Sequence, residues 1–225
     1  MLLISCYKSK GPDSGFVICA VDRTQEKAEM FWRDESNRPL QSLRNLKSFL
    51  NKRNKTLRFA MNGGMFTEHN MPKGLYIENY RILKPLDTLK GKGNFYLEPN
   101  GIFYRTANDT YAVVSTKSFR YCTDIESATQ SGPMLIYNGT INPVFHRNSS
   151  NMNVRNGVGI LKNGNPVFVM SKKKVNFYHF AQVFKSLGCR NALYLDGFVS
   201  RAYFPAGNWK QEDGDFGVMI GVVGK

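Results

Sequence analysis

Apolar residues along this chain fall mainly into short runs, and most of these runs end in a loop-forming sequence. Short apolar runs bounded by glycine, asparagine or proline are typical of β-strands. The clearest examples cover residues 16–21, 57–61 and 192–195. The pattern therefore favours a chain rich in strands.

Three pairs of runs flank turn sequences, and each pair predicts a β-hairpin. The predicted hairpins join 101–105 to 111–115, 134–137 to 140–141 through Asn138-Gly139, and 158–161 to 166–170 through Asn163-Gly164. Asparagine followed by glycine is a strong local signal, because both residues tolerate the backbone angles that a tight hairpin turn requires.

Two segments have helical spacing instead. Leucines recur every three or four residues from Leu40 to Leu50, after Pro39. Phe177, Phe180, Phe184 and Leu187 have the same spacing, and Gly188 follows as a stop signal. The remaining positions of the first segment are polar or basic, so its leucines are expected to face the core.

Composition permits a sizeable core, because 42% of the 225 residues are hydrophobic and 13% are aromatic. No low-complexity linker or internal repeat divides the sequence. We therefore predict one α+β domain over residues 1–225, in which two principal helices pack on a mixed, largely antiparallel β-sheet system.

The chain is strongly basic, with 31 Lys and Arg against 17 Asp and Glu, a formal net charge of +14. This balance favours anionic partners such as phosphorylated small molecules or acidic glycans, although a well-solvated basic surface also explains it. The cations are dispersed, and no nucleic-acid-binding signature is present, so no nucleic-acid partner is expected. The sequence also has no stretch typical of a transmembrane segment.

The start of the sequence leaves two interpretations open. Leu3-Ile4-Ser5-Cys6 resembles a bacterial lipobox, which would make residues 1–10 a remnant of an export segment and place the protein outside the cytoplasm, lipid-anchored at Cys6. Only five residues precede Cys6, too few for a signal peptide. If the recorded start is genuine, the match is chance and the protein is cytoplasmic.

Cysteine usage adds little, since four cysteines without CxxC spacing do not make a disulfide scaffold. Cys19, Cys122 and Cys189 are interpreted as small buried residues, with their disulfide state left open.

Polar side chains accompany glycine where several apolar runs end. Asn62, Ser131, Arg155, Asp196 and Ser200 all occupy such positions. Glycine allows a tight turn or a close approach to a ligand, and a carboxylate just past a strand end is held on a rigid support. We expect these five groups to converge on one pocket assembled from several strand ends.

Seven motifs in order carry a resemblance to a known family. They are Asn62-Gly63-Gly64-Met65-Phe66, Pro72-Lys73-Gly74-Leu75, Gly93-Asn94-Phe95-Tyr96, Pro99-Asn100-Gly101-Ile102-Phe103, Ala128-Thr129-Gln130-Ser131-Gly132-Pro133-Met134-Leu135, Arg155-Asn156-Gly157-Val158-Gly159 and Asn191-Ala192-Leu193-Tyr194-Leu195-Asp196-Gly197-Phe198-Val199-Ser200. From about residue 59 onward the chain resembles the phosphodiester glycosidase family, above all its compact bacterial branch. It departs from the lysosomal type of that family at Asp196-Gly197-Phe198, where that type has further glycines.

The resemblance implies hydrolysis of a sugar-1-phosphodiester in glycan or envelope metabolism. It implies catalytic roles for Asp196, as the carboxylate, and for Arg155, as the cation that holds the phosphate. The residues implied to bind substrate are Asn62, Gly63, Gly64, Asn94, Gln130, Ser131, Gly132, Gly197 and Ser200.

Further candidates extend this set. Lys73, Arg147 and Arg201 are possible helpers at the phosphate, and Glu68 and His69 are candidate proton donors. A phosphodiester is already a good leaving group, which reduces the need for a second catalytic carboxyl group.

Nothing in these motifs requires a cofactor or predicts a metal site, although a divalent cation on Asp196 is compatible with them. The alternative function is a non-catalytic protein that binds an anionic sugar or nucleotide-like ligand in the same pocket.

Overall fold

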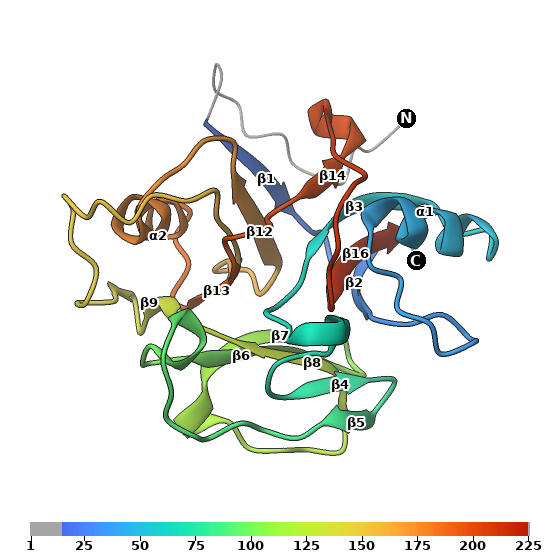
Figure 1. Ribbon diagram of the computed structural model, residues 1–225, viewed down its shortest axis with the longest axis horizontal. Coiled ribbons are helices and arrows are strands. Elements are labelled where there is room, and N and C mark those ends of the chain that lie inside the picture. Colours follow the sequence, from blue (N-terminus) through green and yellow to red (C-terminus); the bar gives the residue numbers. More distant parts are fainter. Residues whose placement is uncertain (1–14, 225) are drawn as a thin grey trace.

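The computed structural model describes residues 15–224, which form sixteen β-strands and two α-helices (Figure 1). The predicted lipid-anchor residue Cys6 lies outside these described residues. Cys19 and Cys189 are buried as predicted, whereas Cys122 is exposed, which corrects its predicted burial. None of the described helices has the length and apolar content needed to cross a bilayer.

The strands are short and follow one another closely along the chain. The first eight are β1 (Phe16–Ala20), β2 (Glu26–Phe31), β3 (Leu57–Asn62), β4 (Tyr76–Glu78), β5 (Arg81–Lys84), β6 (Gly101–Thr106), β7 (Tyr111–Ser115) and β8 (Ile125–Ser131). The remaining eight are β9 (Met134–Tyr137), β10 (Thr140–Ile141), β11 (Asn156–Ile160), β12 (Pro166–Ser171), β13 (Ala192–Asp196), β14 (Ala202–Phe204), β15 (Trp209–Lys210) and β16 (Met219–Gly224).

These strands form three sheets. Their orders are β1-β12-β11-β13-β9-β10, β15-β14-β3-β16-β2 and β5-β4-β8-β6-β7. Every strand pairing among the described residues is antiparallel, so the predicted mixture of parallel and antiparallel strands is corrected to antiparallel sheets alone. The fold is dominated by β-structure.

One hydrophobic cluster lies between the three sheets and takes side chains from each of them. Phe168 of β12 occupies its middle, 5.6 Å from the ring of Phe59 on β3 and 5.8 Å from the ring of Phe103 on β6. The cluster therefore joins the sheets through direct contact of aromatic rings. It also explains why several strands are continuous apolar runs: one face points into this cluster and the other is covered from outside.

The two helices cover outer faces of two sheets, at opposite sides of the molecule in Figure 1. Helix α1 (Leu43–Asn51) packs on β3 with Leu43, Leu46 and Leu50 buried. It begins later than the apolar spacing suggested, because the Ser42 side chain accepts a hydrogen bond from the Asn45 N–H (3.2 Å) and caps the helix there.

Helix α2 (Phe177–Ser186) packs on β9 and β10 of the six-stranded sheet. Asn176 caps it by accepting a hydrogen bond from the His179 N–H at 2.9 Å. Gly188, with φ of 79°, follows its end as predicted. Phe180 and Phe184 are fully buried against the sheet, which confirms the predicted apolar face.

The three predicted hairpins and both helices are confirmed. The strands that the sequence pattern did not predict include β2, β8 and β16. β16 lies between β3 and β2, and it forms its sheet with segments far away in the chain.

Replacing Phe168 by alanine should remove the ring that joins the three sheets and leave a cavity between them. We expect the Phe168→Ala variant to lose about 3–5 kcal/mol of unfolding free energy, measured by chemical denaturation. The control is Tyr121→Ala, because Tyr121 is an exposed ring. A loss at Phe168 no larger than at Tyr121 would show that the central cluster does not hold the sheets together.

Candidate active site

Asp196 is the last residue of β13, and its side chain is only 8% exposed. The carboxylate oxygen Oδ1 accepts hydrogen bonds from two backbone N–H groups, those of Gly197 (2.6 Å) and Phe198 (3.2 Å). These bonds bend the chain around the carboxylate immediately after the strand. The predicted presentation of a carboxylate at a strand end is therefore what the structure has.

Two buried asparagines connect Asp196 to the neighbouring sheet. Asn156 on β11 accepts a hydrogen bond from the Asp196 N–H at 2.8 Å. Its Nδ2 donates to Asn62 at the end of β3, both to the backbone oxygen (2.9 Å) and to Oδ1 (2.8 Å). The same Asn62 Oδ1 also accepts from the Arg201 N–H at 3.1 Å.

These bonds fix the orientation of the Asn62 amide. Because Oδ1 accepts from two donors, Nδ2 is the free end of the side chain, and it has no partner of good hydrogen-bond geometry although it is fully buried. The amide nevertheless lies close enough to the Asp196 carboxylate to lower the pKa of that group. The Asn62 Nδ2 donor therefore faces the Asp196 carboxylate and favours its ionised form.

The pKa of Asp196 is raised overall. Burial is the largest cause, and the N–H groups of Phe198 and Gly197 and the Asn62 side chain oppose it only in part. A carboxyl group that is buried without a cationic partner at ion-pair distance is costly to ionise. Such perturbed groups cluster at functional sites.

Arg155 precedes β11 and is completely buried. Its Nε donates to the Val175 oxygen (2.8 Å), and its Nη2 donates to the backbone oxygen (2.8 Å) and Oδ1 (3.0 Å) of Asn151. Nη1 lies 3.3 Å from the Tyr194 hydroxyl. These contacts occupy four of the five N–H groups of a guanidinium and leave one, on Nη1.

The charge of Arg155 is not neutralised by a carboxylate within ion-pair distance in the described part of the chain. The guanidinium instead stacks on the ring of Phe177, 3.6 Å from its centroid. Burial lowers the pKa of Arg155, yet a guanidinium stays protonated in proteins. The site thus contains a buried positive charge.

Tyr194 lies between the arginine and the carboxylate, and the sequence motifs did not identify it as a site residue. Burial raises its pKa, so the phenol stays protonated and acts as a neutral hydrogen-bonding group. Its hydroxyl contacts Gly197, and it interacts with the Asn94 side chain. Residues two apart in a strand share a face, a signal in the sequence that places Tyr194 beside Asp196.

The remaining predicted residues divide into two groups, those beside Asp196 and those that support it. Ser200 lies beside it, because its Oγ donates to the backbone oxygen of Asp196 at 3.0 Å, and Asn94 interacts with the Tyr194 hydroxyl. Gly197 has no room for a Cβ, because the Tyr194 hydroxyl occupies that position. Ser131 supports β13, since its hydroxyl donates a hydrogen bond to the backbone oxygen of Leu195 at 2.8 Å.

Gln130 is engaged in a structural network. Its Oε1 accepts from the N–H groups of Leu75 (2.9 Å) and Asp87 (3.0 Å), and its Nε2 donates to the Asp87 oxygen at 2.7 Å. Both ends of the Gln130 amide are therefore hydrogen-bonded to the surrounding backbone. Its predicted contact with substrate has no support from this geometry.

The three other predicted glycines allow close packing. A Cβ at Gly63 would lie 2.8 Å from the Ile220 side chain, and one at Gly64 would lie 2.7 Å from Thr129 Oγ1. A Cβ at Gly132 would lie 2.7 Å from the Phe95 oxygen, beside the loop that carries Asn94. These glycines let the surrounding strands and loops approach the site.

The predicted helper cations contact other residues, and no ion pair within residues 15–224 connects any of them to Asp196. Lys73 lies 4.6 Å from the Tyr96 ring, Arg147 lies over the Tyr178 ring, and Arg201 pairs with Asp213 at 2.9 Å. Glu68 and His69 form an exposed 3-10 turn, and no hydrogen bond or ion pair among the described residues connects either of them to Asp196.

The described residues contain no group of three or more His, Cys, Asp or Glu side chains that could hold a metal ion. A divalent cation at Asp196 would have the single carboxylate and neighbouring amide oxygens as ligands. The expectation that no cofactor is required stays a prediction.

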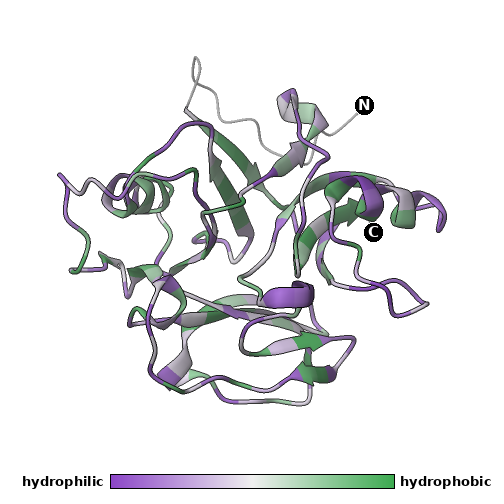
Figure 2. Ribbon diagram, in the orientation of Figure 1, coloured by the Kyte–Doolittle hydropathy of each residue, from purple (hydrophilic) through white to green (hydrophobic). Residues whose placement is uncertain are grey.

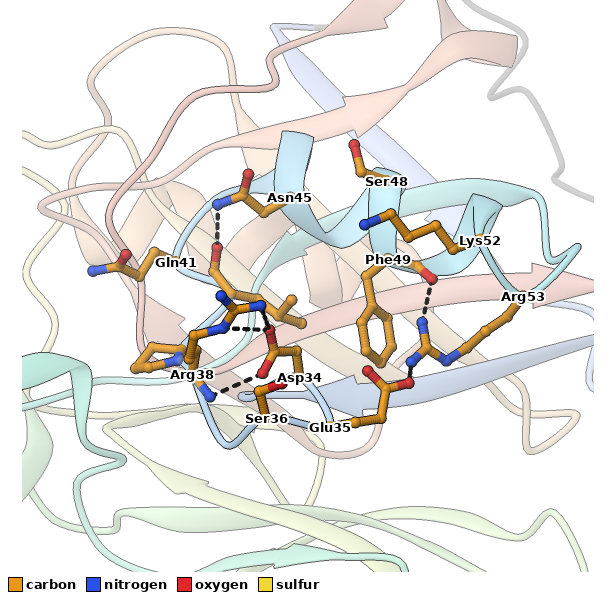
Figure 3. A pocket seen from close by; sticks show the side chains of 12 residues that line it. Asp34, Glu35, Ser36, Arg38, Gln41, Asn45, Ser48, Phe49, Lys52 and Arg53 are labelled. Carbon is orange, nitrogen blue, oxygen red and sulfur yellow. Dashed lines mark hydrogen bonds and ion pairs between the residues drawn. The ribbon is translucent and has the colours of Figure 1, made fainter.

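Figure 3 shows a different hollow, of about 720 Å³, between the 34–41 loop and α1. Its acidic groups are paired with neighbouring cations, Asp34 with Arg38 at 2.9 Å and Glu35 with Arg53. Asp196, Arg155 and Asn62 do not line it. We place the candidate active site at Asp196, because perturbed buried groups without an ion-pair partner gather there and not in the hollow of Figure 3.

Comparison with known proteins defines the class. The fold and the matched sequence are those of phosphodiester glycosidases, whose family model matches residues 55–223. The chain belongs to this family. It is 39% identical over 206 residues to YigE, an uncharacterised protein of Escherichia coli K12, covering 91% of this chain and 80% of that protein.

Solved structures share the fold. The zebrafish N-acetylglucosamine-1-phosphodiester alpha-N-acetylglucosaminidase catalytic domain, auto-inhibited by its pro-peptide, matches with a TM-score of 0.64 and 12% identity over 91% of this chain and 75% of that domain. A Burkholderia pseudomallei protein described as exported matches with a TM-score of 0.61 and 11% identity, over 92% of this chain and 73% of its own.

The raised pKa of Asp196 makes a prediction about stability. The folded state holds this proton more tightly than the unfolded state, so the contribution of Asp196 is fully present at low pH and is lost as the pH rises through the folded pKa. We expect Asp196→Asn to be more stable than the wild type at neutral pH by about 1 kcal/mol. The advantage should shrink as the pH is lowered toward about 3.

Thermal and chemical unfolding across this pH range measures the difference. Asp124→Asn serves as the control, because Asp124 is an exposed carboxylate and its replacement should leave stability nearly unchanged. A destabilised Asp196→Asn variant at neutral pH would mean that the buried carboxylate is needed for folding.

Proposed function

We propose that this protein hydrolyses a sugar-1-phosphodiester, with Asp196 as the catalytic carboxylate. Membership of the phosphodiester glycosidase family supports the reaction class. The observation that carries the proposal is that one site contains both a buried carboxylate, whose pKa is raised, and a buried arginine. The arginine forms no ion pair with a carboxylate among the described residues. Tyr194 lies between them.

The two charges suit different parts of such a substrate. Arg155 and the neutral Tyr194 hydroxyl are proposed to bind the phosphate, because a buried positive charge without a counter-ion attracts an anion. The occupied guanidinium leaves one N–H for direct contact, so Arg155 acts mainly through its charge and through Tyr194. A bidentate grip on the phosphate is not part of the proposal.

Asp196 is proposed to act at the sugar carbon that is bonded to the phosphate oxygen. It stabilises the developing oxocarbenium ion, attacks it or activates water, while the bond between the sugar and the phosphate oxygen breaks. The departing group is a phosphomonoester, which leaves without strong acid assistance. The buried Asn62 amide lies beside the carboxylate and favours its ionised form.

The proposed location is outside the cytoplasm, in the periplasm or cell envelope, where glycan phosphodiesters are metabolised. The structural likeness to a Burkholderia protein described as exported agrees with this placement. The alternative function keeps the same groups but uses them to bind an anionic sugar without turnover. Asp196 is the only carboxylate in the seven motifs, whereas ordinary glycosidases use two carboxyl groups, and this difference supports that alternative.

The direct test is release of reducing sugar from a panel of sugar-1-phosphodiesters. We expect turnover by the wild type and a loss of at least about a thousandfold in kcat for Asp196→Asn, because the developing charge at the sugar loses its carboxylate. Asp124→Asn is the matched control. Tight binding by both proteins without release would favour the binding function.

Hydrolysis in ¹⁸O-labelled water identifies the bond that is cleaved. Label in the released sugar means that the bond between the sugar carbon and oxygen breaks, as proposed. Label in the phosphomonoester means that water attacks phosphorus, and the assignment of Asp196 to the sugar would then be wrong.

Arg155 provides a test of the proposed charge. Arg155→Lys keeps the charge and Arg155→Met removes it, so we expect kcat/KM to fall by about tenfold to a hundredfold in the first and about a thousandfold in the second. Arg190→Met is the control, since Arg190 is an exposed cation whose loss should change kcat/KM by no more than about twofold. Equal losses in both Arg155 variants, with folding retained, would argue against a role for the charge.

A further inference from the structure

A second part of the surface exposes several apolar side chains within a short stretch of the chain. Four of the nine exposed large apolar side chains of the described residues lie in residues 80–92, here called the 80–92 segment. They are Tyr80, Ile82, Leu83 and Leu89, and Leu89 is 74% exposed. Single exposed apolar residues are ordinary, but a cluster within one short segment marks an interaction surface.

The segment projects from the edge of a sheet. Strand β5 is the first strand in the order β5-β4-β8-β6-β7, so it pairs on one side only. The register shift between Tyr76 and Ile77 places Leu83 as an extra residue on β5. In Figure 2 this edge strand is coloured as hydrophobic at the periphery of the molecule, with a polar loop leading away from it.

Cations accompany the apolar residues. Arg81, Lys84, Lys90 and Lys92 lie in the same segment, and none of them is within ion-pair distance of a carboxylate in residues 15–224. The segment has one acidic residue, Asp87, whose carboxylate accepts from the Leu89 N–H (2.9 Å) and the Tyr96 hydroxyl (3.1 Å). The exposed charge of the segment is therefore positive.

A second copy of this chain is a poor occupant of the edge. Antiparallel pairing of β5 with β5 would bring Arg81 and Lys84 against the same cations of the other copy, and like charges opposite one another are destabilising. The extra residue on β5 also disturbs the regular pattern of backbone donors and acceptors that edge pairing requires.

We propose that the 80–92 segment docks the protein on an anionic membrane surface. Ile82 and Leu89 enter the boundary between headgroups and acyl chains, while Lys84, Lys90 and Lys92 contact the anionic headgroups. Exposed apolar side chains bordered by lysine and arginine are the combination that such an interface binds. The proposal is independent of catalysis, because it uses no residue of the Asp196 site.

The experiment is sedimentation of the whole protein with two kinds of vesicle, phosphatidylcholine alone and an equal mixture of phosphatidylcholine and phosphatidylglycerol. We expect binding to the mixed vesicles and little to the neutral ones. The triple variant Lys84→Gln/Lys90→Gln/Lys92→Gln should bind the mixed vesicles on the order of a hundredfold more weakly. The double variant Ile82→Ser/Leu89→Ser should bind them about tenfold more weakly.

Matched variants elsewhere on the surface separate this segment from the general basic charge. Lys162→Gln/Lys185→Gln/Arg190→Gln removes the same number of positive charges, and Val144→Ser/Met152→Ser removes two other exposed apolar side chains. Both controls should bind within about twofold of the wild type at physiological salt. Circular dichroism and melting temperature verify that every variant is folded.

Three results would overturn the proposal. Wild-type protein that does not sediment with mixed vesicles contradicts it directly. Equal losses in the two triple variants would mean that net charge, and not this segment, causes binding. Wild-type binding by Ile82→Ser/Leu89→Ser, with loss only in the cation variant, would identify a site for soluble polyanions such as nucleic acid.

Discussion

The side-chain amide of Asn156 is the interaction on which the arrangement of the site depends. It accepts from the Asp196 N–H and donates to both oxygens of Asn62, so one buried group connects β13, β11 and β3. Two of these strands belong to one sheet and the third to another. Because all three residues are buried, the loss of any one would leave polar groups unsatisfied, and the network is maintained as a unit.

Local sequence was sufficient for much of the fold. The hairpins were predictable because turn residues such as Asn138-Gly139 act within a few positions, and the helices because Leu43, Leu46 and Leu50 repeat at helical spacing. The same local logic placed Asp196 at a strand end. Glycine beside a polar residue also identified Asn62 and Arg155, whose contacts lead to Asp196 through Asn156 and Tyr194.

Cross-strand relations were not predictable in this way. Strand β2 contains charged residues and pairs with β16, almost the whole chain away, so neither signals its partner locally. The roles of Asn156 and Tyr194 depend on the register between β11 and β13. Gln130 illustrates the opposite error, since a polar residue in a motif looks like a ligand until its amide is found bonded to Leu75 and Asp87.

The energetics of the site favour a ligand over a purely structural role. Asp196 and Arg155 are both buried, and neither is neutralised by an ion pair in the described residues. Burying an ionised group without its counter-ion costs stability, and replacing such a group with an apolar one often increases stability. Phe177 and Tyr194 hold the arginine in place although its burial lowers the stability of the folded protein. A phosphate would supply the missing counter-ion for Arg155, while the sugar beside it would meet the carboxylate of Asp196.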